Sequence, residues 1–410
     1  MGVLCISNVV SGMDRGSMVR KRNIALLISA LHQGGAERVV SRLSYILSER
    51  YDVFVFLIDT GEQFYECGCP VIDVGGDKRG FRAKEINCAI NINKYLKKYN
   101  IDSMISFMGA SNFINIVFAK NVKRIISIRA CYNKMLKDVI KDEKGYYTEV
   151  LLQKILYKYA NQIVTVSKVQ EYLLRKELGE NANITTIENP IDIVEIKMLA
   201  KEPIDSDVEK FIKTHYTTVA VGRICYQKNY ELMIDIFEHL VDTNPRAGLL
   251  ILGAGDKEHL KQILANRKLE KNVRIIGSIK NPFAYIGKCR CYISTSRYEG
   301  FPNALIEAMA CGIPVISTDC FTGPQEIIQD DIIKEVKDVI VGDYGILIPD
   351  IYRTMLVDDK DRVLNSISNI WNKILTDYEF ADDYAHKAAI RCEKYSKENC
   401  AKKWIKLIEE

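Results

Sequence analysis

Short apolar runs of strand length recur along the chain, and most are followed by a segment with helical spacing. The run Asn23–Ser29 (NIALLIS) is apolar at most positions, which is typical of a strand buried on both faces. Segment 36–50 then places its apolar residues on one face of a helix. Further strands are predicted at 53–58, 71–74, 104–107, 124–128, 162–166 and 185–187. This alternation predicts a parallel sheet with right-handed crossovers.

The same pattern restarts after a charged stretch, residues 191–215, that has no strand signal. Because 410 residues exceed the size of one ordinary core, we predict two α/β domains, each a doubly wound, Rossmann-like sheet. Their expected limits are 23–190 and 216–390, with 1–22 as an N-terminal tail and 191–215 as a linker. The later strands are predicted at 217–221, 248–252, 273–276, 291–295, 315–317 and 346–348, and the chain is helical from residue 360.

Composition is that of a globular protein, and three further features of the sequence narrow the class of protein. No run reaches the roughly 18 apolar residues that span a bilayer. The basic residues Arg20, Lys21 and Arg22 follow the weak apolar patch near the N-terminus, so we expect no signal peptide. The 12 cysteines lack metal or redox spacing, as in Cys67-Gly-Cys69, and we expect reduced thiols in a cytoplasmic protein without a metal site.

Charge is unevenly distributed between the two halves. Residues 1–190 carry 27 Lys and Arg against 19 Asp and Glu, a net charge of +8, whereas the remainder carries 30 against 34. The basic half could contact an anionic membrane surface or an anionic substrate, or it could be an ordinary solvated surface. Region 133–160, basic and helical, is a candidate for lipid headgroups, and a helical hairpin covering the sheet is its alternative. We expect no nucleic-acid partner.

The stretch 294–318 (STSRYEGFPNALIEAMACGIPVIST) is the most informative in the sequence. A bend at Gly300, Phe301, Pro302 and Asn303 leads into a short apolar helix, whose first backbone N–H groups form a natural anion site. A glutamate lies on each side of this bend, and the pair could be a general acid and base. Their spacing instead favours contacts with different parts of one ligand, since a carboxylate can accept two hydroxyl hydrogens. These residues are Glu299 and Glu307.

Other candidates lie where predicted strands end, so two α/β domains in series would bring them to one interdomain cleft. Arg223 and Lys228 suit a diphosphate, or they are surface charges. Gly253 begins an incomplete dinucleotide-binding fingerprint. Two interpretations remain for this glycine: it lets the backbone approach a nucleotide, or it forms a tight turn. Gly35 follows the first strand and could contact a phosphate or serve a tight turn. His32 is the one histidine next to a predicted cleft loop.

With these residues in place, the sequence resembles the retaining glycosyltransferases of the GT-B fold, in the group called group 1 or family four. The likeness covers roughly residues 23–405 and is most specific in the second half. The motifs that carry it are Gly34-Gly35-Ala36-Glu37-Arg38, Asn189-Pro190, Gly222-Arg223 with Lys228, Gly253-Ala254-Gly255, Glu299 to Asn303, Glu307 to Gly312, Gly323 to Ile327 and Gly345 to Pro349.

The resemblance implies a nucleotide-diphosphate sugar donor, no cofactor and no metal. It implies that Glu307 holds the ribose hydroxyls and that Arg223 and Lys228 hold the diphosphate. Glu299 and the backbone of the following bend would contact the donor sugar, and the loop around Ile279 would lie against the base. The final helix, residues 391–410, would cross back to the first domain. Weaker acceptor-side candidates are His32, Ser111, Arg129 and Asn189.

One departure from the family pattern concerns the loop 107–112, which has no ionisable residue where many members carry His or Asp. Either the donor phosphate acts as the base, or Arg129 and its neighbours shape the acceptor site differently. The prediction is a glycosyltransferase that moves a hexose or N-acetylhexosamine from a UDP-sugar to a lipid-linked glycan in capsule or O-antigen assembly. We expect it in the cytoplasm, peripheral on the membrane. The alternatives are a non-catalytic nucleotide-sugar-binding partner subunit and a soluble sugar synthase of the same fold.

Overall fold

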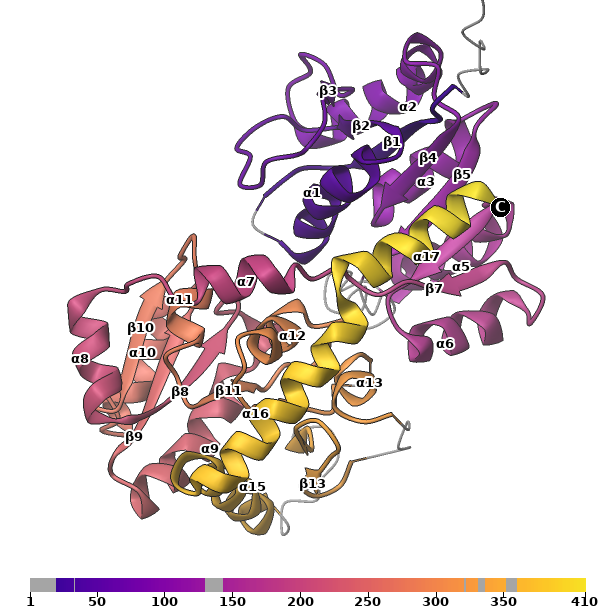
Figure 1. Cartoon of the computed structure of the whole chain (residues 1–410). Coiled ribbons are helices and arrows are strands. Elements are labelled where there is room, and N and C mark those ends of the chain that lie inside the picture. Colours follow the sequence, from indigo (N-terminus) through magenta and orange to yellow (C-terminus); the bar gives the residue numbers. More distant parts are fainter. Residues whose placement is uncertain (1–19, 33, 130–142, 321, 331–335, 352–359) are drawn as a thin grey trace, which may run out of the picture.

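The computed structural model describes residues 20–32, 34–129, 143–320, 322–330, 336–351 and 360–410. They form two α/β domains, and a C-terminal helix returns from the second domain to the first (Figure 1). The predicted tail 1–22 lies almost wholly outside the described residues, as does the first part of the helical region predicted at 133–160.

The first domain is built on seven parallel strands in the order β3-β2-β1-β4-β5-β6-β7. The order reverses between β1 and β4, so the sheet is doubly wound as predicted. The central strand β1 is buried at five of its six positions, which explains its continuous apolar run. The elements are β1 (Asn23–Ile28), α1 (Gly35–Ser48), β2 (Asp52–Leu57), β3 (Val71–Asp73), α2 (Phe81–Lys98), β4 (Ser103–Phe107), α3 (Gly109–Phe118), β5 (Lys123–Ile128), α5 (Glu143–Leu156), η1 (Tyr157–Tyr159), β6 (Gln162–Thr165), α6 (Lys168–Leu178) and β7 (Ile184–Thr186).

Helices cover both faces of this sheet. Helices α1 and α17 (Lys397–Glu409) pack on one face, where Trp404 is fully buried. Helices α2 and α3 pack on the opposite face, and η1 continues that layer beyond β5. The C-terminal helix therefore belongs to the core of the first domain, as the family resemblance implied.

The second domain repeats the design with strand order β10-β9-β8-β11-β12-β14-β13. All neighbours are parallel except β13, which pairs antiparallel with β14 at the edge. Strand β13 has two residues, too few to show periodicity in a sequence. The elements are β8 (Tyr216–Val221), η2 (Tyr226–Lys228), α9 (Tyr230–Thr243), β9 (Ala247–Leu252), α10 (Lys257–Asn266), β10 (Val273–Gly277), α11 (Phe283–Ile286), β11 (Cys291–Ser294), α12 (Asn303–Ala310), β12 (Val315–Thr318), α13 (Pro324–Ile328), β13 (Ile340–Val341) and β14 (Ile346–Ile348).

Helices also make up the linker and the end of the chain. The linker holds α7 (Ile193–Leu199) and α8 (Ser206–Thr214), which agrees with its missing strand signal. Helices α15 (Lys360–Thr376) and α16 (Tyr378–Cys392), then η4 (Glu393–Tyr395), lead to α17. In the described part of the chain, no helix combines the length and apolarity needed to cross a membrane.

Candidate active site

Loops that follow strands of both sheets meet at the boundary between the domains. In the second domain, the loop 295–302 joins β11 to α12. In the first domain, Gly35 opens α1 directly after β1, and a Cβ atom there would lie 3.5 Å from Nδ2 of Asn303. Ligands of open α/β sheets bind at these carboxyl-terminal strand ends. The boundary is therefore the place to look for a substrate site.

Lys228 and Glu299 form an ion pair with 2.6 Å between Nζ and Oε1. Lys228 ends η2 and Glu299 lies in the loop before α12, and both side chains are largely buried. Gly222 follows β8 with a φ of 154°, which favours glycine, and a Cβ atom there would come within 2.8 Å of Cε of Lys228. Thr322 supports the loop, since its hydroxyl donates a hydrogen bond to the carbonyl of Glu299. The ammonium is thus held in a shielded place, where charges interact more strongly than they do in water.

Glu307 crosses the domain boundary by an ion pair with two arginines of α1. Its Oε1 lies 2.5 Å from Nη1 of Arg38 and 3.2 Å from Nη2 of Arg42. The glutamate is 2% exposed. Burial alone would raise the pKa of this carboxyl, but the two guanidiniums outweigh burial and hold the pKa below its usual value. Glu307 is therefore a buried carboxylate that stays ionised.

A chain of polar side chains joins the two domains beside this ion pair. Arg129 donates from Nη1 to Oδ1 of Asn189 at 2.8 Å, and Asn189 donates from Nδ2 to Oδ1 of Asn303 at 2.6 Å. The guanidinium of Arg129 lies between the rings of Phe107 and Trp404, with its Cζ 5.7 and 5.5 Å from their centroids. Burial lowers its pKa to about 9. In the described part of the chain, Nη2 of Arg129 has no hydrogen-bond partner.

The carboxylate of Glu37 folds back over the first turn of α1. A Cβ atom on Gly34 would lie 2.2 Å from its Oε2, and its own backbone N–H hydrogen-bonds the carboxylate. Burial raises the pKa of this carboxyl, while the charges of His32 and Arg223 oppose that rise. A carboxylate of α1 itself therefore lies beside the first turn of that helix, where the helix dipole favours negative charge.

A second carboxylate of the second domain also reaches the first. Glu326 on α13 accepts hydrogen bonds from the backbone N–H groups of Lys168 and Val169, at 2.7 and 2.8 Å. These groups open α6, where unpaired amides favour an anion. Burial raises the pKa of Glu326 despite these bonds. The contact borders a pocket of about 240 Å³ that Phe301 and Tyr395 also line.

Comparison with known proteins gives this arrangement a chemical context. Residues 202–341 match the family of group 1 glycosyl transferases. This chain carries a group 1 glycosyltransferase domain. An N-acetylgalactosamine-N,N'-diacetylbacillosaminyl-diphospho-undecaprenol 4-alpha-N-acetylgalactosaminyltransferase of Campylobacter jejuni is 26% identical over 94% of this chain and 99% of its own length. CapH, a capsular polysaccharide biosynthesis glycosyltransferase of Staphylococcus aureus, is 26% identical over 72% of this chain and 80% of its own.

Among solved structures, the HepE protein of Anabaena in complex with UDP and glucose superposes with a TM-score of 0.70. The match covers 95% of this chain and 99% of that one, at 16% identity, and so bears on the fold alone. Together with the two doubly wound sheets, these matches confirm the family resemblance and the GT-B fold.

Apart from Gly35, the predicted donor residues belong to the second domain. Gly300 and Pro302 are buried, and the ring of Phe301 packs edge-on against Tyr395 at 5.2 Å, so this bend can offer a ligand little more than its backbone. Arg223 is exposed, and Ile279 is half-buried. At Gly253 a Cβ atom would lie 1.9 Å from the carbonyl oxygen of Gly222, which explains the glycine as a close approach of backbones.

The predicted acceptor residues differ in their exposure and in their contacts. His32 is exposed, whereas Ser111 is fully buried and its hydroxyl lies 3.4 Å from that of Ser29. Ser111 therefore packs within the first domain. Arg129 and Asn189 lie behind the donor bend in the polar chain already described, and in this position they support Asn303.

Arg38 and Arg42 are the clearest residues that the sequence left without a role. Their spacing of four residues places them on one face of α1, and this signal was open to a sequence reader. What no local pattern could give is their partner, because Arg38 and Glu307 are 269 residues apart.

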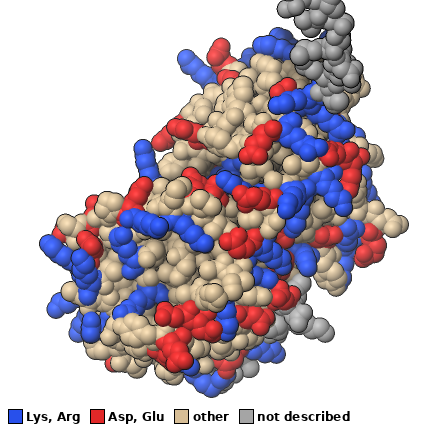
Figure 2. Space-filling model, viewed as in Figure 1, with Lys and Arg blue, Asp and Glu red and all other residues tan. Residues whose placement is uncertain are grey.

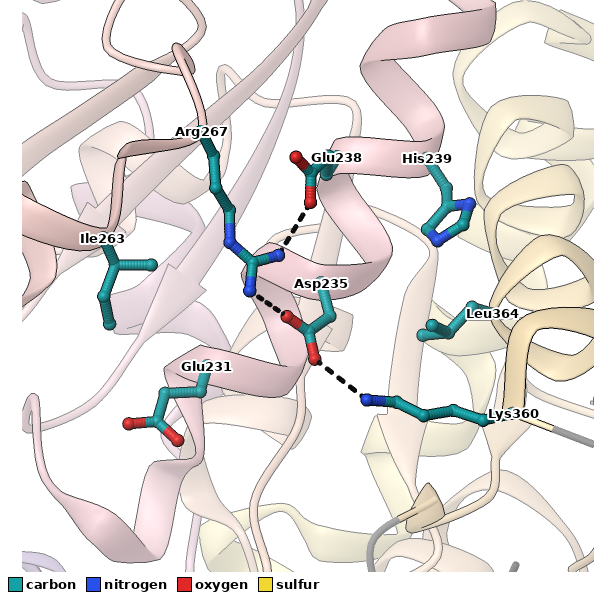
Figure 3. A pocket seen from close by; sticks show the side chains of 8 residues that line it. All are labelled: Glu231, Asp235, Glu238, His239, Ile263, Arg267, Lys360 and Leu364. Atoms are coloured by element: carbon teal, nitrogen blue, oxygen red, sulfur yellow. Dashed lines mark hydrogen bonds and ion pairs between the residues drawn. The ribbon is translucent and has the colours of Figure 1, made fainter. Parts of the chain in front are cut away.

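A hollow of about 480 Å³ on the second domain serves as a contrast (Figure 3). It lies between α9, α10 and α15, and four of its charged side chains pair with one another. Arg267 contacts Asp235 at 2.5 Å and Glu238 at 2.8 Å, and Lys360 lies 3.6 Å from Asp235. These are helix side chains away from the strand ends, so we interpret the hollow as a structural ion network. Among the described residues, no cluster of His, Cys, Asp and Glu could hold a metal ion.

Proposed function

We propose that the protein is a retaining glycosyltransferase that transfers a hexose or N-acetylhexosamine from a UDP-sugar to a lipid-linked glycan. The observation that carries this proposal is the buried pair of Lys228 and Glu299 beside the donor bend. The relatives support the finer points. One is named for a diphospho-undecaprenol substrate, one for capsular polysaccharide biosynthesis, and a protein of the same fold was solved with UDP. We therefore place the reaction in cell-surface polysaccharide assembly.

In this proposal the first-domain side admits the acceptor hydroxyl and the second-domain side holds the donor. The acceptor oxygen forms a bond to the anomeric carbon of the sugar while the bond from that carbon to the diphosphate oxygen breaks. The hydroxyl proton passes to the leaving phosphate, because loop 107–112 offers no base. Lys228 and Arg223 meet the negative charge that develops on that phosphate, which is the main electrostatic task of the step. This role for two protein cations is why we propose that no metal ion is needed.

The test is to incubate the purified protein with a panel of UDP-, GDP-, ADP- and CMP-sugars and to measure release of free sugar by NMR. We expect slow hydrolysis of one UDP-sugar with retention at the anomeric carbon. Lys228→Ala and Glu299→Ala should each lower that rate by orders of magnitude. Lys261→Ala removes an exposed lysine of α10 and should leave the rate unchanged. A protein that binds the nucleotide but shows no turnover with any donor or glycan acceptor would favour the partner-subunit alternative.

We further propose that the enzyme is cytoplasmic and peripheral on the inner face of the cell membrane. The support is a surface of the first domain formed by α2, α3 and α5. The outer sides of these helices carry large apolar side chains, several of them four residues apart, where a solvated helix is normally polar. These exposed residues are Ile86, Ile90, Phe113, Val117, Leu151, Leu152 and Ile155.

Charge on the same surface fits an anionic bilayer. Among the described side chains of α2, α3 and α5, the one carboxylate is Glu85, whereas exposed cations are frequent. Exposed apolar side chains combined with basic residues are typical of helices that lie in a membrane interface. The face shown in Figure 2, which includes α1 and α17, instead mixes both signs of charge. The exposed cations are Arg82, Lys94, Lys97, Lys98 and Lys154.

Vesicle sedimentation tests this surface independently of catalysis. Leu151→Glu should reduce binding to vesicles of phosphatidylglycerol and phosphatidylcholine. Ile390→Glu is a matched control, because both side chains are 57% exposed but Ile390 lies on α16 of the second domain. Equal binding of the two variants would contradict the proposed surface. A change in oligomeric state on gel filtration with Leu151→Glu alone would show that a second copy covers it instead.

A further inference from the structure

The two carboxylate oxygens of Glu307 are unequally engaged. Both guanidiniums, of Arg38 and Arg42, donate to Oε1. Among the described residues, every hydrogen bond and ion pair of the Glu307 carboxylate goes to Oε1, and none goes to Oε2. A carboxylate oxygen that lacks a protein donor has the capacity to accept a ligand hydroxyl. Only one of the two carboxylate oxygens of Glu307 is therefore engaged by the protein, and Oε2 is a candidate acceptor for a hydrogen bond from a ligand.

The arginines are themselves fixed by other residues of the first domain. Nε of Arg38 donates to the hydroxyl of Tyr65 at 3.2 Å, and its guanidinium lies 5.5 Å from the centroid of that ring. Nη1 of Arg42 donates to the carbonyl of Pro190 at 3.0 Å. Because each guanidinium has a second anchor, Oε1 of Glu307 is held in one place and the carboxylate cannot rotate freely.

We propose that Arg38 and Arg42 are positioning residues that complete the donor site from the opposite domain. They keep Glu307 ionised and fix its Oε1, so that Oε2 accepts a hydrogen bond from a ribose hydroxyl of the donor. The inference rests on the proposed function, because it takes Glu307 as the ribose contact. It adds that the ribose site is complete only when the two domains are together. Donor binding and the contact between the domains are then coupled through one carboxylate.

The coupling can be measured with a nucleotide that lacks the hydroxyl. We would determine the Kd of the full-length protein for UDP and for 2′-deoxy-UDP by calorimetry, after ranking UDP, GDP, ADP and CDP. The native protein should prefer the ribonucleotide roughly 10- to 100-fold, as expected for a hydrogen bond to a charged group. In Arg38→Ala and in the double variant Arg38→Ala/Arg42→Ala, this preference should fall towards unity. Arg38→Lys should restore part of it.

Arg50→Ala is the matched control, since Arg50 follows the end of α1 and pairs with Glu409 rather than with Glu307. It should keep the full preference for the ribonucleotide. If Arg38 and Arg42 were merely structural, both nucleotides would bind more weakly by the same factor and the preference would survive, which would overturn the inference.

Failure of the two proposals can be told apart. Absence of binding of every nucleoside diphosphate would overturn the proposed function and this inference together. Binding of UDP with an unchanged preference in the variants would overturn this inference alone. Should an alanine variant fail to fold, Arg38→Lys and Arg42→Lys carry the same comparison, because a single ammonium cannot reproduce the paired geometry and should lower the preference.

Discussion

The two sides of the domain boundary hold their charges in different ways. On the second-domain side, Lys228, Glu299 and Glu307 come from η2, a loop and α12, and the first two pair within that domain. On the first-domain side, the cations Arg38 and Arg42 have their carboxylate partner in the other domain. The pair of Lys228 and Glu299 can therefore form within the second domain alone, whereas Arg38 and Arg42 have their carboxylate partner only when the two domains are in contact.

The largest expected effect concerns the contact that joins the two sides. Glu307→Ala leaves two largely buried guanidiniums without their carboxylate, and removal of one partner of a buried ion pair costs about 3–5 kcal/mol. We expect a loss of that order in the free energy of unfolding, measured by urea denaturation. Asp383→Ala is the control, because it breaks an exposed pair with Lys387, and it should cost less than about 1 kcal/mol. Equal effects of the two substitutions would mean that the boundary contact is no stronger than a surface pair.

The next effect is on chemistry and is confined to the donor side. Glu299→Gln keeps the shape of the side chain but removes the charge that faces Lys228 at 2.6 Å. We expect turnover to fall about 100-fold, in the range of a lost electrostatic contact at a reacting group. Stability should change little, because the amide oxygen still accepts a hydrogen bond from the ammonium. The ratio of kcat between Glu299→Gln and native protein checks this, and an unchanged kcat would remove Glu299 from the reacting region.

This contrast also explains what the sequence could reveal. The buried strands, their order of appearance and the donor stretch with Glu299 and Glu307 follow from local patterns of apolar and turn residues. The fold class and the family were therefore predicted correctly. The partners of Glu307 could not be, because hydrophobic periodicity places Arg38 on a helix face but does not say which surface meets that face. Strand β13 was not predicted for a different reason, because a strand of two residues is too short to show an alternation of apolar and polar positions.

A smaller effect is expected from the polar chain beside the ion pair. Asn189→Ala removes the acceptor of Nη1 of Arg129 and the donor to Asn303, both inside the protein. Loss of buried hydrogen bonds of this kind costs roughly 1–3 kcal/mol. Thermal unfolding should show a lower Tm than that of Asn365→Ala, whose exposed amide lies 3.1 Å from Nδ1 of His239. A loss as large as that of Glu307→Ala would mean that this chain, rather than the ion pair, dominates the boundary.

The smallest expected effect is the pH dependence of stability, which distinguishes the two carboxylates Glu326 and Glu307 that cross the domain boundary. Burial raises the pKa of Glu326, so its protonation stabilises the folded state as pH falls through that pKa towards the ordinary value of 4.5, and this gain is lost as pH rises again. Glu307 behaves oppositely, because its lowered pKa means that its contribution is complete above 4.5 and is lost only as pH falls through the folded pKa. As pH falls from 7 towards 4.5, therefore, Glu326 should take up its proton before Glu307 does.

The measurement is the free energy of unfolding at pH 7 and pH 5 for native protein, Glu326→Gln and Glu307→Gln. Groups elsewhere in the chain titrate alike in all three and cancel in the differences. Glu326→Gln should reduce the stabilisation gained between pH 7 and pH 5, by at most about 1.4 kcal/mol for each unit by which the folded pKa exceeds the ordinary value. Glu307→Gln should lower stability equally at both pH values. A pH-dependent loss for Glu307→Gln would mean that the arginines fail to keep this carboxylate ionised, and that the first-domain cations do not complete the donor side as proposed.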